Sequence, residues 1–388
     1  MEKRRKEKEN YGGFEQGPIR PPSEANSLLI RVTRNCPWNR CTFCPVYKDS
    51  RFSIRPVEHV LEDIDTVAEH VESLRRAMDS RGRIDRAELS RLSEKTPQWR
   101  SAAFSAALRW FSGGMRSIFI QDANSLVIAP ADMIQILKHL KSRFYWVERI
   151  TSYARSHTIV RIKDEDLSFM ALAGLNRIHI GLESGADSVL KLVKKGVTKA
   201  THIKAGKKVK KAGMELSEYV MPGLGGKKLS SEHAIETADA LNQIDPDFIR
   251  LRTLAIPEIV PLYKERESGD FEKCTDVEMA KEILLFIESL NGIHSKVKSD
   301  HILNLFEEVE GDLPQDKEKM SAVLINFLNL SPEQQCFYQV GRRLGIFRRL
   351  SDMQSTRRME RVEQTCREHD ITPENVESVI DELMKRFI

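Results

Sequence analysis

Short apolar, β-branched runs recur at a nearly constant interval through the middle of this 388-residue chain, and this recurrence restricts the fold more than any other feature. The runs start about 30 residues apart, which is the length that a βαβ unit requires. Helix-forming segments fill the intervals, and glycine in Ala173-Gly174 and Ala212-Gly213 supplies a helix stop before two of the strands. Such alternation predicts a parallel sheet or barrel covered by helices. The predicted strands cover residues 117–121, 146–150, 177–181, 215–221 and 248–256.

An earlier run over residues 27–33 predicts the first strand. The long interval before the second strand has a helical pattern over residues 57–111, which predicts a helical insertion. Beyond Pro261 we expect no further strands, because the remaining segments are amphipathic. They cover residues 275–292, 301–309, 315–329 and 373–387. We therefore predict a mobile lead-in over residues 1–25, a core over 26–260 and a helical C-terminal region over 261–388.

Three of the six cysteines, Cys36, Cys41 and Cys44, fall within nine residues directly after the first predicted strand. Three thiolates converging on one centre leave a coordination position open, whereas a structural zinc site is closed by four ligands. Thiolates are also the usual ligands of iron–sulfur clusters, and Pro45 matches the Cys-Pro ending of some cluster-binding runs. An iron–sulfur cluster is therefore the favoured interpretation.

Two other interpretations of the cysteines stay open. Zinc would need a distant fourth ligand, for which His59 and His70 are the nearest candidates, although both lie in a helical pattern. The thiols could also carry no metal. The remaining cysteines, Cys274, Cys336 and Cys366, are far apart in the sequence and do not predict a second cluster.

The composition excludes several classes of protein. Six cysteines in 388 residues are too few for a disulfide-rich scaffold, and no apolar stretch is long enough to cross a membrane. The charged N-terminus lacks the apolar stretch of a secretory signal, so we expect a cytoplasmic protein. The 61 Lys and Arg exceed the 57 Asp and Glu by only four, which is too small a charge to indicate a nucleic-acid partner.

Together, the three cysteines after the first strand, the aromatic Phe43 before the last of them and the six-fold β/α repeat resemble the radical S-adenosylmethionine (radical SAM) superfamily. The resemblance covers about residues 26–260. The usual spacing in that superfamily is C-x3-C-x2-C, whereas this chain has C-x4-C-x2-C. The resemblance to the superfamily implies an α/β fold with a partial (β/α)6 TIM-like barrel. The segments Gly-Leu-Glu-Ser-Gly at 181–185 and Pro-Gly-Leu-Gly-Gly at 222–226 are most similar to the branch with oxygen-independent coproporphyrinogen oxidase and the elongator-type acetyltransferase.

The resemblance also implies roles for individual residues. The three cysteines of the loop would ligate a single [4Fe–4S] cluster. S-adenosylmethionine would be held by residues at the carboxyl ends of successive strands, where such barrels build their sites. The cofactor-binding candidates are Phe43, Asp122, Asn124, Ser152, Arg155, Glu183, Ser184 and Met221.

The implied chemistry is that of a radical enzyme. An electron from a reductant such as flavodoxin or ferredoxin would pass through the cluster, cleave S-adenosylmethionine and leave a 5′-deoxyadenosyl radical that abstracts hydrogen from a substrate. The substrate is unknown, and we expect a small molecule rather than RNA or protein. Two rival functions remain, namely a non-enzymatic haem or cofactor chaperone on the same fold and a zinc-binding interaction protein.

Two weaker signals lie outside these motifs. Nine lysines and no acidic residue occur between Lys191 and Lys211, and we interpret them as a solvated outer helix rather than a phosphate-binding face. In the C-terminal region His301 and Glu307 are candidates for positioning a substrate or relaying a proton. The alternative for this pair is an Asp-capped helix with an acidic outer side.

Overall fold

A computed structural model describes residues 10–385. They form two compact units. The first contains the chain up to Pro37 together with Asp49–Ile178 and Ala212–Met214, and the second contains Trp38–Lys48, His179–Lys211 and the chain from Glu215 onward. No described helix has both the length and the apolar character needed to cross a lipid bilayer.

The chain has the predicted α/β fold, and each of the six predicted strands has a counterpart in one sheet. Consecutive strands of the first unit pair in parallel, β1 with β4 and β4 with β5, and β7 pairs in parallel with β8 in the second unit. In the strand order β6 follows β5 and precedes β7. The bounds are β1 (Leu28–Arg31), β4 (Ser117–Gln121), β5 (Arg149–Ala154), β6 (Leu175–Glu183), β7 (Glu215–Val220) and β8 (Phe248–Leu251).

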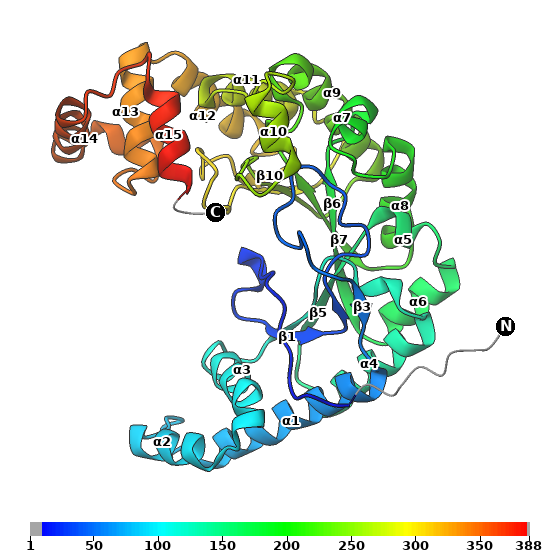
Figure 1. The fold of residues 1–388 in the computed structure, drawn as a ribbon. Coiled ribbons are helices and arrows are strands. Elements are labelled where there is room, and N and C mark those ends of the chain that lie inside the picture. Colours follow the sequence, from blue (N-terminus) through cyan, green and yellow to red (C-terminus); the bar gives the residue numbers. More distant parts are fainter. Residues whose placement is uncertain (1–9, 386–388) are drawn as a thin grey trace. The chain divides into compact units, whose positions relative to one another are not determined.

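The predicted insertion after the first strand is helical. It contains α1 (Val57–Arg76), α2 (Arg86–Lys95) and α3 (Ser101–Ser112). Apolar residues at helical spacing on α1, including Val60, Ile64 and Val67, are buried. α1 packs against α3, as Figure 1 shows, and against α4 (Pro130–Arg143), so this stripe belongs to the core of the first unit. Two further helices complete this unit, α5 (Ser156–Ile159) and α6 (Asp164–Leu172).

The lead-in is anchored to the first unit from residue 11 onward. The Tyr11 hydroxyl donates a hydrogen bond to Asp63 on α1 over 2.8 Å. The Glu15 carboxylate forms ion pairs with Arg34 at 2.6 Å and Arg55 at 3.3 Å. The part of the expected mobile segment that precedes residue 10 lies outside the described residues.

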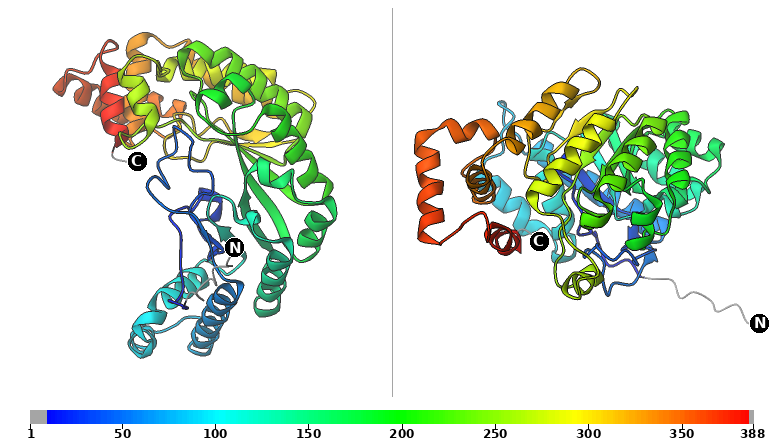
Figure 2. Two further views of the ribbon diagram at one scale, coloured as in Figure 1. Left: turned by 45° about the vertical axis from the view of Figure 1, so that its right-hand side comes forward. Right: turned by 90° about the horizontal axis from the view of Figure 1, so that it is seen from above.

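The second unit contains nine of the described helices. Around its strands lie α7 (Asp187–Leu192), α8 (Lys199–Lys211), α9 (Gly226–Ile244), α10 (Pro261–Glu267) and α11 (Asp276–Ser289), followed by α12 (Lys317–Leu328), α13 (Pro332–Arg343), α14 (Thr356–Glu368) and α15 (Val376–Met384). α13 packs against both α14 and α15, and Figure 2 shows these three helices grouped in orange and red. Short 3-10 turns occur at 22–24, 98–100, 125–127 and 350–354.

The structure corrects the expectation that strands stop beyond Pro261. β9 (Lys296–Lys298) pairs in parallel with β8, and β10 (Gly311–Asp312) pairs antiparallel with β9. Runs this short carry too few alternating residues to be recognised as strands. Residues 301–309, predicted to be helical, form turns and irregular backbone instead.

The strand predicted over 146–150 is shifted by three residues, because β5 begins at Arg149. Trp146 precedes this strand and lies in an aromatic cluster. Its ring is edge-on to Phe144 and stacked on Trp110, with the ring centres of the two tryptophans 6.4 Å apart. The glycine helix stops are confirmed: Gly174 and Gly213 have φ values of 110° and 79°, which residues with a side chain rarely adopt.

Candidate functional site

The cysteine loop begins immediately after a two-stranded pairing in the first unit. β2 (Thr33–Arg34) pairs antiparallel with β3 (Ser53–Ile54), which joins the two ends of the loop that carries the cysteines. Cys36 follows β2 by two residues, so its backbone position is set by the end of this pairing. Asn35, between them, has a left-handed φ of 67°, a conformation that asparagine tolerates.

Asp122 fixes the start of this loop. Its buried carboxylate accepts hydrogen bonds from the backbone N–H of Asn35 over 3.0 Å and from Nε of Arg31 over 2.8 Å. Gly17 lies against the other carboxylate oxygen, where a Cβ atom would be only 2.3 Å away. Asp122, predicted to bind S-adenosylmethionine, is thus a positioning residue for the residue before Cys36, and its contact with the cofactor stays a prediction.

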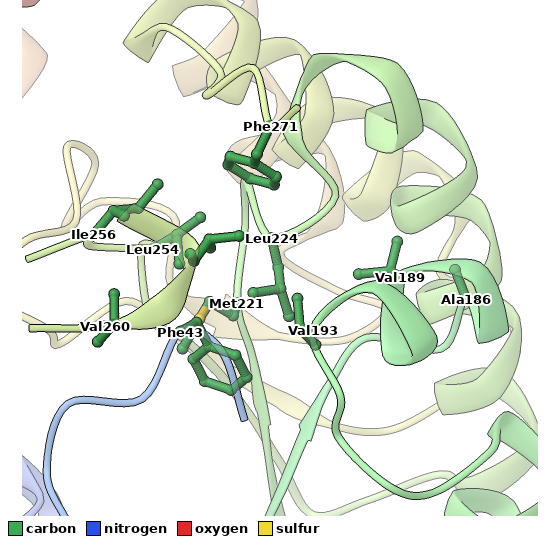
Figure 3. Packing of buried hydrophobic residues seen from close by; sticks show 11 residues of the cluster. Phe43, Ala186, Val189, Val193, Met221, Leu224, Leu254, Ile256, Val260 and Phe271 are labelled. Atoms are coloured by element: carbon green, nitrogen blue, oxygen red, sulfur yellow. The ribbon is translucent and has the colours of Figure 1, made fainter. Parts of the chain in front are cut away.

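Cys41 and Cys44 lie against an apolar cluster in the second unit. Phe43, between them in the sequence, is 7% exposed and packs with Met221 within this cluster, as Figure 3 shows. Both residues were predicted to lie near the cofactor, and the structure brings them together. The other members are Ala186, Val189, Val193, Leu224, Leu254, Ile256, Val260, Leu262 and Phe271.

Backbone hydrogen bonds on both sides hold the loop to the second unit. The Thr42 N–H donates to the carbonyl of Val193, and the Thr42 carbonyl accepts from the N–H of Leu262, both over 3.0 Å. The Lys48 ammonium donates to the Cys41 carbonyl over 2.9 Å. Because both backbone groups of Thr42 are used, the segment between Cys41 and Cys44 is held from two neighbouring elements.

The donor set fits an iron–sulfur cluster in number and type. Among residues 10–385 no disulfide involves Cys36, Cys41 or Cys44, and all three side chains are partly buried. Thiolates are the usual cluster ligands. Within residues 10–385 no three His, Cys, Asp or Glu side chains lie close enough together to hold a metal ion as they stand. The ligation by these cysteines therefore remains a prediction.

The histidines considered as zinc ligands have other surroundings. His70 on α1 is buried edge-on against Phe104, and burial lowers its pKa. His59 lies edge-on to Tyr11 at 5.5 Å. Both side chains are thus part of the packing around α1.

Two predicted residues of the first unit stabilise the turn after β5. The Asn124 amide donates to the Thr158 hydroxyl over 2.9 Å, and its oxygen accepts from the Arg155 backbone N–H over 3.0 Å. Ser152 is buried within β5 rather than after it, as a consequence of the shifted strand. Asn124 and Arg155 are therefore neighbours, as expected for residues at the ends of adjacent parallel strands.

Three predicted residues of the second unit are connected through the end of β6. Glu183 accepts a hydrogen bond from Lys195 over 3.1 Å, and its carbonyl accepts from the Met221 N–H over 3.0 Å. Ser184 Oγ lies 2.8 Å from His233 Nδ1, while His233 Nε2 lies 3.0 Å from the Met221 carbonyl. His233 thus joins Ser184 to Met221, a connection that the sequence alone did not indicate.

The C-terminal pair of candidates is not brought together. Glu307 forms an ion pair with Arg342 at 3.1 Å, and within the described chain no hydrogen bond joins it to His301. Burial, and to a lesser extent Arg252, lower the pKa of His301 to about 4, so the ring is neutral at pH 7. Their catalytic roles remain unsupported predictions.

Glu218 on β7 is a further candidate that no sequence pattern indicated. Its side chain is fully buried, and neither carboxylate oxygen has a hydrogen-bond partner among residues 10–385. Burial raises its pKa well above the usual value; Glu183 adds to this rise, and Lys195 opposes it. A buried residue with a strongly shifted pKa is a typical functional-site candidate, and only its position inside an apolar strand could have indicated it.

The structure also corrects the view of the remaining cysteines as dispersed. Cys336 on α13 and Cys366 on α14 are both buried, and their thiols are hydrogen-bonded to each other, which shifts the pKa of Cys336 upward. Two thiols cannot replace the three of the loop as a cluster-binding set. We therefore still predict a single iron–sulfur cluster.

Comparisons with known proteins bear on the sheet, because the matched residues include β4 to β7. Residues 106–239 match the model of the radical SAM superfamily. The tRNA uridine(34) acetyltransferase of Methanocaldococcus infernus is 21% identical over 282 residues, which are 70% of this chain and 51% of that protein. The chain thus spans about half the length of this relative.

Two solved structures are also similar. The Elp3 protein of M. infernus is 16% identical with a TM-score of 0.40, covering 51% of this chain and 52% of the other. Coproporphyrinogen III oxidase (HemN) from Escherichia coli is 14% identical with a TM-score of 0.43, covering 68% and 52%. The superfamily match over residues 106–239 and the M. infernus acetyltransferase therefore show that this chain is similar to radical SAM enzymes over part of its length.

Proposed function

We propose that this protein cleaves S-adenosylmethionine reductively and uses the resulting 5′-deoxyadenosyl radical to abstract a hydrogen atom from its substrate. The observation that carries the proposal is the loop with three cysteines, two of which flank Phe43 and lie against the apolar cluster that contains Met221. When bound, a [4Fe–4S] cluster would supply the electron for this cleavage. Cys36, Cys41 and Cys44 would hold it.

The chain's own residues would bind and orient the cofactors. Burial of Phe43 and Met221 provides an apolar surface that excludes water beside two of the thiols. Asp122 accepts a hydrogen bond from the backbone of Asn35, just before Cys36. The polar groups of Glu183 and Ser184, each already fixed by a partner, would present oxygen atoms to the amino-acid and ribose parts of S-adenosylmethionine.

For the class of substrate, the names of the relatives favour a different choice from the sequence. The sequence favoured a small molecule, whereas the M. infernus relative is named for its action on a tRNA uridine. We therefore propose RNA as the substrate class. Because the chain spans only about half of that relative, the acetyl transfer in its name is not included in this proposal.

The test is anaerobic reconstitution of the full chain with iron and sulfide, followed by addition of S-adenosylmethionine and dithionite. Release of 5′-deoxyadenosine supports the proposal. A loaded cluster without cleavage would favour the cofactor chaperone, and one tightly bound zinc without iron would favour the interaction protein. Cys41→Ala serves as the control, because residual release from this variant would show that the activity does not come from the loop.

A further inference from the structure

The nine lysines between Lys191 and Lys211 divide into distinct groups in the structure. One group is neutralised by carboxylates of the same unit and belongs to its packing. It contains Lys195 with Glu183 at 3.1 Å, Lys199 with Glu236 at 2.6 Å, and Lys210 with Asp247 at 2.7 Å. These ion pairs lie within the second unit. Because each ammonium group already has a carboxylate partner, these three lysines are poorly suited to bind an external anion.

A second group lines an open hollow of about 460 Å³ on α8. Four lysines, Ala200 and Ile203 of α8 and Gln243 of α9 form its wall, and the lysines are Lys204, Lys207, Lys208 and Lys211. All but Lys208 are exposed, and within residues 10–385 neither Lys204 nor Lys207 forms an ion pair. We call this surface the lysine groove.

The lysine groove has a regular geometry. Positions 204, 207, 208 and 211 follow the i, i+3, i+4, i+7 spacing of one helix face. At a rise of 1.5 Å per residue they span about 10 Å, at three levels separated by roughly one helical turn. A row of positive charges repeated at each turn matches a ligand whose negative charges are also repeated along its length.

We propose that the lysine groove binds the phosphodiester backbone of RNA. Lysine binds phosphate as a point charge without demanding one geometry, which suits contacts to a backbone rather than to a base. The inference rests on the proposed function for its choice of RNA among polyanions. It assigns a role to a surface that lies outside the cysteine loop and its apolar cluster.

Other partners fit the groove less well. Its apolar part consists only of Ala200 and Ile203, which offers neither the aromatic anchors of a protein interface nor the bulky side chains that insert into a membrane surface. Arg342 and Arg343 of α13 do not form an alternative site. Arg342 donates to the carbonyls of Leu305 and Phe347, and Arg343 pairs with Asp276.

The test measures binding of a fluorescein-labelled, unmodified tRNA transcript to the reconstituted enzyme by anisotropy at several salt concentrations, without reductant. The variant is K204Q/K207Q/K208Q/K211Q. Each lost contact to single-stranded RNA should reduce the slope of log affinity against log salt by about 0.7, so the four together should reduce it by about 3. Glutamine keeps a good helix propensity, which preserves α8.

The matched control is K138Q/K228Q/K281Q/K319Q, which removes the same charge from exposed positions on other helices. An unchanged slope in the groove variant, or an equal loss in the control, would overturn the proposal. So would binding of phosphatidylserine vesicles in place of tRNA. Release of 5′-deoxyadenosine by the wild-type protein is measured in parallel. An unchanged slope in the groove variant with intact release defeats only the groove, whereas absent release defeats the proposed reaction.

Discussion

The carboxylate of Asp122 accepts a hydrogen bond from the backbone N–H of Asn35 over 3.0 Å, and Asn35 immediately precedes Cys36. The same carboxylate pairs with Arg31 at the end of β1. One buried side chain after β4 therefore holds both the end of β1 and the start of the cysteine loop. This connection makes the loop's starting position depend on a residue 86 positions away from Cys36 in the sequence.

Asp122→Asn should lower both stability and cluster loading. The substitution keeps an acceptor for Asn35 but weakens the charge-assisted bond to Arg31, which is left with the more distant Glu15 carboxylate at 3.7 Å, at a cost of about 1.5 to 3 kcal/mol. We expect a lower midpoint of thermal unfolding and less iron per chain after reconstitution. The exposed Asp49→Asn, in the same loop, is the control and should change neither quantity.

A direct contact between Asp122 and S-adenosylmethionine would have a further signature. In that case the fraction of Asp122→Asn that does load a cluster should bind S-adenosylmethionine more weakly than the wild type. Unchanged affinity in the loaded fraction, measured by equilibrium binding, would restrict Asp122 to positioning the loop.

Cys41→Ala should abolish iron loading, whereas Cys336→Ala should leave the iron content unchanged. Cys41 lies in the loop beside the apolar cluster, while Cys336 is 2% exposed and hydrogen-bonded to Cys366 in the helical C-terminal region. Iron and acid-labile sulfide are measured per chain after anaerobic reconstitution. Equal losses from the two substitutions would contradict the assignment of the cluster to the loop.

The repeating part of the fold could be predicted from the sequence because each of the parallel strands from β1 to β8 in the large sheet is a separate apolar run ended by a turn signal. α6 (Asp164–Leu172) fills one of the predicted intervals and ends just before Gly174, one of the two predicted helix stops. β9 and β10 have three and two residues, too few for a periodicity, and their pairing comes from the neighbouring strand. Residues 301–309 have a helical spacing, yet Asn304 bonds the backbone of Thr253 and Leu251, which holds the segment in turns.

The candidate site was predictable in its residue types and less so in their connections. The three cysteines and Phe43 are local in sequence, so their spacing indicates them directly. The bridge from Ser184 through His233 to Met221 joins residues on three elements, and no local pattern encodes it. Glu218 was missed because a single acid in an apolar strand resembles an edge residue until its burial is known.

Glu218→Gln should stabilise the protein more at high pH than at low pH. Burial raises the pKa of Glu218 in the folded state, so the folded protein binds its proton more tightly than the unfolded chain. Stability from this group is complete below the unfolded pKa of about 4.3 and falls as pH rises toward the folded pKa. The neutral glutamine removes this fall, so its advantage in urea-unfolding free energy should grow between pH 4 and pH 8.

The control for this prediction is another buried carboxylate of the second unit. Glu282 accepts hydrogen bonds from the Gly223 N–H over 2.7 Å and from the Ser230 hydroxyl. Its replacement by glutamine weakens satisfied, charge-assisted bonds and should lower the unfolding free energy at pH 8. A gain from Glu282→Gln equal to that from Glu218→Gln would show that the effect is not specific to the unpaired acid.

Gly196→Ala should loosen the cysteine loop through Trp38. Gly196 has a φ of 75°, and a Cβ there would lie 2.3 Å from the Trp38 ring, whose indole N–H donates to the Lys194 carbonyl over 2.8 Å. The alanine must displace the indole, and with it the chain that leads to Cys41. We expect faster iron release to a chelator from the reconstituted variant. Gly213→Ala is the control that separates this clash from backbone strain, because Gly213 has a φ of 79° with open space around its Cβ position. Equal rates of iron release from the two variants would assign the effect to the backbone strain alone.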